Sequence, residues 1–281
     1  MHNNRGRRIL FLALLCGAFA QAHAGDRLLA TGGVTQIEGA AGGGLVPWGV
    51  LTGTASDNGV GASAAISRVG VDDYTLDVKG VAINAYNRLE LSFARQRLVL
   101  DALGGELEQD IVGAKVRLFG DVLYHPWGQW SLGIQYKRLD DFSLPRAVGA
   151  RDDSGIDVYL AGSKLFFAAL AGRNVLLNAT LRSTRANQGG LLGFGGDRDA
   201  SRELVAEASL GIFITPHWLA GIEYRQKPDA LSFAEEDDWK DIFVAFVPSK
   251  HVSLTAAWVD LGSIAGLDDQ QGVYLSLQAA Y

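Results

Sequence analysis

Apolar residues recur at every second position in many short segments of this chain, and this spacing constrains the fold more than any other feature. In one such segment Trp130, Leu132, Ile134 and Tyr136 alternate with small or polar residues. A β-strand points successive side chains to opposite faces, whereas a helix needs apolar residues three or four positions apart. Segments of this kind recur from about residue 50 to residue 281. The sequence therefore predicts an all-β protein built from two-faced strands.

The N-terminus predicts export. Three arginines among the first eight residues precede an apolar stretch, Ile9 to Ala20, and a small-x-small sequence, Ala22-His23-Ala24. This is the layout of a cleaved secretory signal peptide, so we expect residues 1–24 to be removed. The single cysteine, Cys16, lies inside that peptide. We therefore expect a mature chain without disulfides or thiolate chemistry.

The composition narrows the class further. The formal net charge is −6 and there is no basic block, so a nucleic-acid partner is not expected. Beyond the signal peptide no apolar run approaches the ~20 residues of a membrane-spanning helix. Hydrophobic residues still make up 48% of the chain. A transmembrane β-barrel combines these properties, because only alternate residues of its strands meet lipid.

The two faces of the strands favour a membrane barrel over a soluble sandwich. The polar faces are rich in Gly, Ser, Thr and Asn, with scattered charges, and aromatic residues stand near the strand ends of the apolar faces. Such aromatics are typical of the girdles at the two membrane interfaces. Those expected in girdles are Trp130, Tyr136, Trp218, Tyr224, Trp258 and Tyr281. Short and long connections also alternate along the chain, which predicts inner turns and outer loops.

The strand count is open between two values. Twelve strands are expected from residue 60 onward, centred near residues 64, 78, 91, 116, 134, 161, 178, 208, 222, 244, 256 and 276. Residues 47–56 and Val34 to Ala40 could add two more, and hairpin closure requires an even number. We expect an antiparallel barrel of 14 strands, with 12 strands and a lumenal N-terminal segment as the alternative. The expected organisation is a Gly-rich segment at 25–48, either first strand or lumenal plug, followed by the barrel at 49–281.

The last segment of the chain resembles the C-terminal signal of bacterial outer-membrane barrels. That signal combines a polar residue, a glycine, spaced apolar residues and a terminal aromatic. The matching residues are Gln270, Gly272, Leu275, Leu277 and Tyr281. The resemblance implies recognition by the barrel-assembly machinery and location in the outer membrane of a Gram-negative cell.

The stretch from Ala30 to Trp48 resembles the start of an uncharacterised proteobacterial family, the domain of unknown function 3034. The family carries a signal peptide and an expected outer-membrane barrel, and the resemblance extends over the mature length. It implies a location and a fold but brings no known substrate.

Charged residues on the polar strand faces are the candidate site, because such residues set the field in a pore. Both signs occur, which predicts weak ion selectivity. The residues expected to face the lumen are Asp77, Lys79, Arg88, Glu90, Lys115, Arg117, Lys137, Asp157, Arg182, Glu207, Glu223 and Arg225.

The sequence gives little indication of metal binding, catalysis or a cofactor. The outer loops are acidic, but they lack the regular spacing of a calcium loop, so a solvated rim is expected and no metal site is assigned. His125, His217 and His251 fall in separate inner turns without a catalytic grouping, and no cofactor motif is present. We therefore expect no enzyme and no cofactor.

The leading hypothesis is a passive porin-like channel or small-solute binder of the outer membrane, in contact with its lipid and lipopolysaccharide. A closed barrel with a structural or surface-binding role is the first alternative, and a lipid-acting barrel enzyme is the second. The solute and the oligomeric state are left open.

Overall fold

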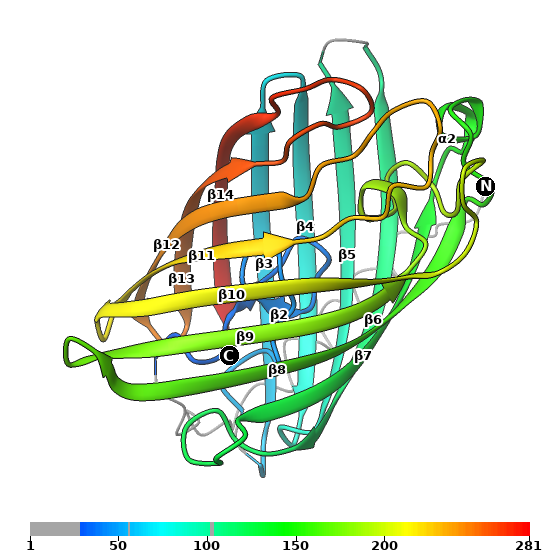
Figure 1. Ribbon diagram of the computed structural model, residues 1–281. Coiled ribbons are helices and arrows are strands. Elements are labelled where there is room, and N and C mark those ends of the chain that lie inside the picture. The colour runs from blue at the N-terminus through cyan, green and yellow to red at the C-terminus, as the bar shows by residue number, and fades with distance from the viewer. Residues whose placement is uncertain (1–28, 56, 102–103) are drawn as a thin grey trace, which may run out of the picture.

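The protein is a closed antiparallel β-barrel with a segment of chain inside it (Figure 1). The computed structural model describes residues 29–55, 57–101 and 104–281, so the expected signal peptide lies outside the described residues. The barrel strands are β3 (Val60–Val71), β4 (Tyr74–Ala85), β5 (Leu89–Leu100), β6 (Glu106–Phe119), β7 (Gln129–Leu139), β8 (Ser154–Leu170), β9 (Arg173–Thr184), β10 (Glu203–Thr215), β11 (Trp218–Arg225), β12 (Trp239–Ser249), β13 (Val252–Asp260) and β14 (Gln271–Ala280).

The barrel closes where the last strand pairs with β3. β14 runs antiparallel to β3 from the pair Gly272–Val71 to the pair Ala280–Ser63. The expectation of fourteen strands was therefore wrong, and the alternative of twelve is confirmed. Of the two additional strand candidates, Val34 to Ala40 contributes only a two-residue strand, β1 (Val34–Thr35). It pairs with β2 (Ala41–Gly42) in a separate two-stranded sheet that is not part of the barrel wall.

Each barrel strand exposes one face and buries the other, as the period of two dictates. On the closing strands Ile66 and Leu275 point outward, with 58% and 56% of their surface exposed, whereas their neighbours Ser67 and Ser276 are buried inside. A barrel leaves no unpaired edge and satisfies its backbone within the sheet, which is what a membrane demands of a spanning strand. The exposed apolar face is the lipid-facing band of such a barrel.

The two ends of the barrel differ in their connections. At one end, here the turn end, β8 and β9, β10 and β11, and β12 and β13 are joined by two-residue turns. At the other end, here the loop end, the connections include residues 140–153, 185–202 and 226–238. Two short helices, α2 (Ser143–Ala147) and η1 (Asn187–Gly190), lie in the loops of that end. In the part of the chain that the structure describes, no helix is long and apolar enough to cross a membrane.

Residues 29–55, here the plug, fold inside the barrel. Nearly all of the plug from residue 34 onward is buried, although β1 and β2 are its only regular structure. Both ends of the plug lie at the turn end. Ala30 lines a small cleft with Lys250, and the N–H of Thr54 donates to the carbonyl of Tyr281 (3.2 Å). The plug is therefore a loop inserted from the turn end.

The lumen is apolar toward the loop end. Ile37 and Leu45 of the plug belong to one buried cluster with inner-wall residues such as Leu76 and Leu98, and Leu191 and Ile264 of the outer loops join it. The loops thus cover the tip of the plug through an apolar contact, and the lumen is closed on that side as well.

Candidate functional site: the plugged lumen

The middle of the plug is held by polar side chains of the inner wall. The carbonyl of Gly49 accepts hydrogen bonds from Gln129 Nε2 (2.8 Å) and Ser131 Oγ (2.6 Å), and its N–H donates to Ser163 Oγ (2.8 Å). A Cβ at position 49 would lie 2.5 Å from the carbonyl oxygen of Gln129, so only glycine fits there. An irregular buried backbone needs such partners, because an unpaired buried peptide group costs about as much as a lost hydrogen bond.

A lysine and a glutamate of neighbouring strands bind two parts of the plug at once. Lys115 Nζ donates to the carbonyls of Ala41 (2.8 Å), Trp48 (3.2 Å) and Val50 (2.8 Å). Its partner Glu90, 3.4 Å away, accepts the N–H of Ala41 (3.1 Å) and of Thr52 (2.6 Å). Both side chains are only 1% exposed. The pair therefore supplies charged donors and acceptors to the plug backbone in a dry environment.

The carboxylate of Glu38, near the tip of the plug, lies among three cations of the wall. It contacts Lys137 Nζ (2.5 Å), Arg182 Nη1 (2.9 Å) and Arg225 Nη2 (2.6 Å). These cations come from β7, β9 and β11, at the loop ends of the strands. Asp157 and Glu207 of the intervening strands β8 and β10 complete the cluster, with Asp157 2.8 Å from Lys137 and Glu207 2.5 Å from Arg182.

A second carboxylate of the wall binds the next turn of the plug. Glu223 accepts the N–H of Leu45 (2.7 Å) and the hydroxyl of Ser209 (2.8 Å). Asp241 on β12 is its direct cross-strand partner and is also buried. The inner wall is thus lined with polar groups because a folded segment occupies it, and a polar lumen does not by itself indicate a water-filled pore.

Most of the sequence-predicted lumen residues lie on the inner wall. Arg117 is near the turn end, where it contacts Asp57 (3.0 Å) just after the plug. The others on the inner wall are Glu90, Lys115, Lys137, Asp157, Arg182, Glu207, Glu223 and Arg225. Sequence reasoning missed Glu38 and Asp241. Glu38 lies in a segment treated as a possible strand, and Asp241 is the one charged residue on the inward face of its strand, whose other inward residues are apolar.

Asp77, Lys79 and Arg88 do not face the lumen, and for them the expectation was wrong. Arg88 is exposed in the turn between β4 and β5. Asp77 and Lys79 point outward from β4, where Asp77 pairs with Arg68 (2.6 Å). Asp77 and Lys79 point outward because their strand neighbours Leu76 and Val78 face the apolar part of the lumen.

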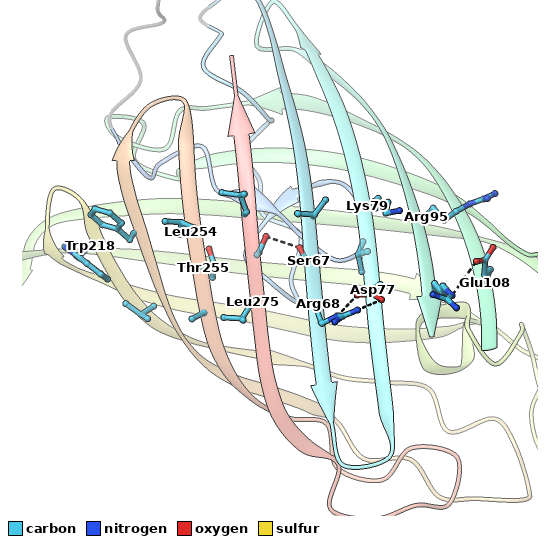
Figure 2. Close-up of a pocket in the computed structure, with 18 residues that line it drawn as sticks. Ser67, Arg68, Asp77, Lys79, Arg95, Glu108, Trp218, Leu254, Thr255 and Leu275 are labelled. Carbon is cyan, nitrogen blue, oxygen red and sulfur yellow. Dashed lines mark hydrogen bonds and ion pairs between the residues drawn. The ribbon is translucent and has the colours of Figure 1, made fainter. Parts of the chain in front are cut away.

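The outer wall carries a shallow hollow of about 940 Å³ that extends across β11 to β14 and β3 to β6 (Figure 2). One side of the hollow is apolar, with Trp218, Leu254 and Leu275, and the other is charged, with Lys79 and Arg95 (Figure 2). Arg95 pairs with Asp110 across β5 and β6 (2.6 Å). These charged pairs show where β3 to β6 extend beyond the apolar band.

The other candidate chemistry does not converge on a site. His217 and His251 lie in separate turns, where their Nδ1 atoms contact the carbonyls of Val247 (2.8 Å) and Ala280 (3.0 Å). Within residues 29–55, 57–101 and 104–281, no three His, Cys, Asp or Glu residues are placed to hold a metal ion.

The residues of the C-terminal motif lie at the barrel seam. Gln270 exchanges hydrogen bonds with Asp73 in the loop between β3 and β4, at 2.8 and 3.1 Å. A Cβ on Gly272 would lie 1.9 Å from the carbonyl oxygen of Gly70, so the seam requires glycine. Leu275 and Leu277 face outward, and the N–H of Tyr281 donates to the carbonyl of Ala62 (2.8 Å).

A closed twelve-stranded barrel with an apolar outer band defines a protein of the outer-membrane β-barrel class. The chain belongs to a family described as a protein of unknown function (DUF3034), whose model matches residues 31–278. A search of curated proteins finds no match.

Several solved structures are similar in fold. The KdgM porin is 9% identical, with a TM-score of 0.51 over 78% of this chain and 99% of that chain. The Acinetobacter baumannii outer-membrane protein Omp33 is 9% identical, with a TM-score of 0.46 over 80% and 100%. The COG4313 outer-membrane channel from Pseudomonas putida F1 is 13% identical, with a TM-score of 0.45 over 80% and 96%. At 9% identity, the likeness to the KdgM porin is one of fold.

Proposed function

We propose that the protein is a gated, porin-like channel of the outer membrane, closed by the plug and opened when the plug withdraws toward the periplasm. The observation that carries the proposal is how the plug is bound. It is a loop with both ends at the turn end, and polar side chains of the wall hold its backbone at Gly49, Ala41 and Leu45. Water entering an open lumen can replace such bonds, which contribute a net ~0.5–1.5 kcal/mol each between neutral groups and ~1.5–3 kcal/mol each to a charged group. Ile37 and Leu45 of the plug also belong to the buried apolar cluster at the loop end, and the loss of these contacts opposes withdrawal.

The orientation follows from the connections, with short turns in the periplasm and the longer loops outside. The apolar outer band then meets membrane lipid, and the charged wall near Arg95 lies at the level of lipopolysaccharide headgroups. In this proposal the signal peptide at residues 1–24 directs export, and the barrel-assembly machinery recognises the C-terminal strand with Tyr281. We assign no catalytic role.

A disulfide between the plug and the wall tests the gate. Thr35 Oγ1 of the plug lies 3.4 Å from Ser63 Oγ on β3, so a T35C/S63C variant places two thiols in contact. The matched control is S67C/S276C, because those hydroxyls lie 2.9 Å apart and both belong to the wall, Ser67 to β3 and Ser276 to β14. We expect oxidised S67C/S276C to conduct in planar bilayers and oxidised T35C/S63C to be silent.

Equal conductance of the two oxidised variants contradicts the gate. The alternative, a closed barrel with a structural or surface-binding role, is favoured by the loop contacts that cover the plug tip at Leu191 and Ile264. It predicts no conductance and no solute flux from any variant, including those that loosen the plug.

A further inference from the structure

The carboxylate of Glu38 occupies a preformed anion site in the wall. Its Oε1 contacts Lys137 Nζ (2.5 Å) and Arg225 Nη2 (2.6 Å), and its Oε2 contacts Arg182 Nη1 (2.9 Å). All three cations are at least 95% buried. Buried cations are rarely left without partners, so the site demands an anion at this position.

Wall residues position most of the site, although Arg225 Nη1 also donates to the carbonyl of Leu45 in the plug (3.1 Å). The guanidinium carbon of Arg182 lies 5.2 Å from the ring centre of Tyr159, and that of Arg225 lies 5.4 Å from the ring of Trp239. Such cation–π contacts fix the planes of both guanidinium groups. Glu207 lies within ion-pair distance of both arginines, at 2.5 and 3.8 Å. The wall therefore positions its donors independently of Glu38.

The local charge balance depends on the plug. Lys137, Arg182 and Arg225 carry three positive charges, and Asp157 and Glu207 supply two negative ones. Glu38 supplies the third, so the six-residue cluster is neutral only while the plug is in place. When the plug withdraws, these five wall residues carry a net charge of +1. Charged groups that line a pore set the field that selects solutes, so this part of the wall attracts anions once the plug has left.

We propose that Lys137, Arg182 and Arg225 form the binding site for a small organic anion bearing a carboxylate, and that Glu38 is its internal occupant in the closed state. The ligand class rests on the proposed gating, because the solute reaches the site only in a channel that opens. A carboxylate is the group indicated, since one planar pair of oxygens accepts from all three cations, and guanidinium groups suit that geometry. A solute carboxylate and Glu38 compete for one site, so the bound solute favours the open state.

Chemical rescue tests the site without relying on conductance. Glu38→Ala removes a CH₂–COO⁻ unit, and acetate restores the same atoms. Acetamide is the neutral control of the same size. For E38A in detergent solution at neutral pH, we expect acetate at ten times its dissociation constant to raise the apparent unfolding temperature by about 3–6 °C. Acetamide should have no such effect, and neither should acetate on the unaltered protein, whose site is filled.

Two further variants keep the result decisive. In E38Q the amide fills the space, so acetate should not stabilise it, and in E38A/R225M the loss of one cation should abolish the rescue. If E38A refolds poorly, the refolding yield in acetate against acetamide replaces the unfolding temperature. An equal response of E38A to acetate and acetamide, or rescue that survives R225M, overturns the anion site.

The two proposals fail separately. A silent channel in every variant refutes the gate but leaves the refolding yield of E38A in acetate against acetamide interpretable, because acetate can enter the site while the barrel folds. A conducting channel without acetate rescue refutes the anion site and leaves the gate intact. Replacing acetate by phosphate in the rescue distinguishes a site for carboxylates from one for any oxyanion. Rescue by phosphate equal to that by acetate contradicts the carboxylate assignment.

Discussion

Replacing Lys115 by methionine should release the plug. Methionine keeps much of the volume of the side chain but removes the charge that binds the carbonyls of Ala41, Trp48 and Val50. It also leaves Glu90, which is 1% exposed, without its cation. The substitution therefore weakens the plug's attachment while leaving the backbone pairs of the barrel intact.

The size of the effect follows from these contacts. A hydrogen bond to a charged group contributes about 1.5–3 kcal/mol, and removing one partner of a buried ion pair costs about 3–5 kcal/mol. The bonds of one ammonium group are not additive, so we take about 4 kcal/mol for the whole loss. At 1.4 kcal/mol per factor of ten, the ratio of withdrawn to docked plug rises by about 10³.

Single-channel recording in planar bilayers measures this ratio as the open fraction. The matched control is K164M, because Lys164 Nζ also donates to two carbonyls, those of Leu123 (2.9 Å) and His125 (2.8 Å), but these belong to a turn and not to the plug. K115M should be open far more often than K164M. The double variant K115M/E90Q should be less affected than K115M in stability, since no uncompensated carboxylate is left. Equal open fractions for K115M and K164M would refute the reasoning.

Three other changes probe separate parts of the structure. Gly49→Ala places a Cβ 2.5 Å from the carbonyl oxygen of Gln129, so it should raise the open fraction without changing any charge, and an unchanged open fraction would contradict the tight fit. Gly272→Ala should lower the yield of folded barrel in a gel-shift assay, because its Cβ would collide with β3 at the seam; a normal yield would show that the seam adapts. Two hydrogen bonds from Ser232 lower the pKa of Asp197 below its ordinary value, so this loop contact contributes stability above about pH 4 and loses it as the pH falls through the lowered pKa. The measurement is the rate at which pepsin cuts residues 185–201, divided at each pH by its rate on an unfolded reference peptide. This ratio should rise as the pH falls in the unaltered protein and stay constant in D197N. The same dependence on pH in both proteins would exclude this contact as the cause.

The strands were predictable because lipid and lumen impose opposite polarity on alternate residues. Leu132 and Ile134 against Ser131 and Gln135 show the rule in its simplest form, and the structure exposes the first pair and buries the second. The inward charges of β7 to β11 follow from the same rule.

The expectation that polar residues face the lumen fails where the lumen is filled by apolar groups. Toward the loop end, plug and loops fill the lumen with apolar groups, so Leu76 and Val78 face inward and Asp77 faces out. The plug has no regular spacing of apolar residues, because side chains that lie far away in the sequence determine its conformation. Glu38 is a clear case, since its partners lie about 100 to 190 residues away. A Gly-rich stretch with an isolated acidic residue was the available signal, and it fits a plug better than a strand.

Addition of a reductant to oxidised T35C/S63C in a single planar bilayer tests the central claim most directly. We expect no current while the disulfide holds the plug to β3, and channel openings in the same bilayer once the bond is reduced. Current before reduction, or continued silence after it in a bilayer where S67C/S276C conducts, would contradict the claim that the plug gates this barrel.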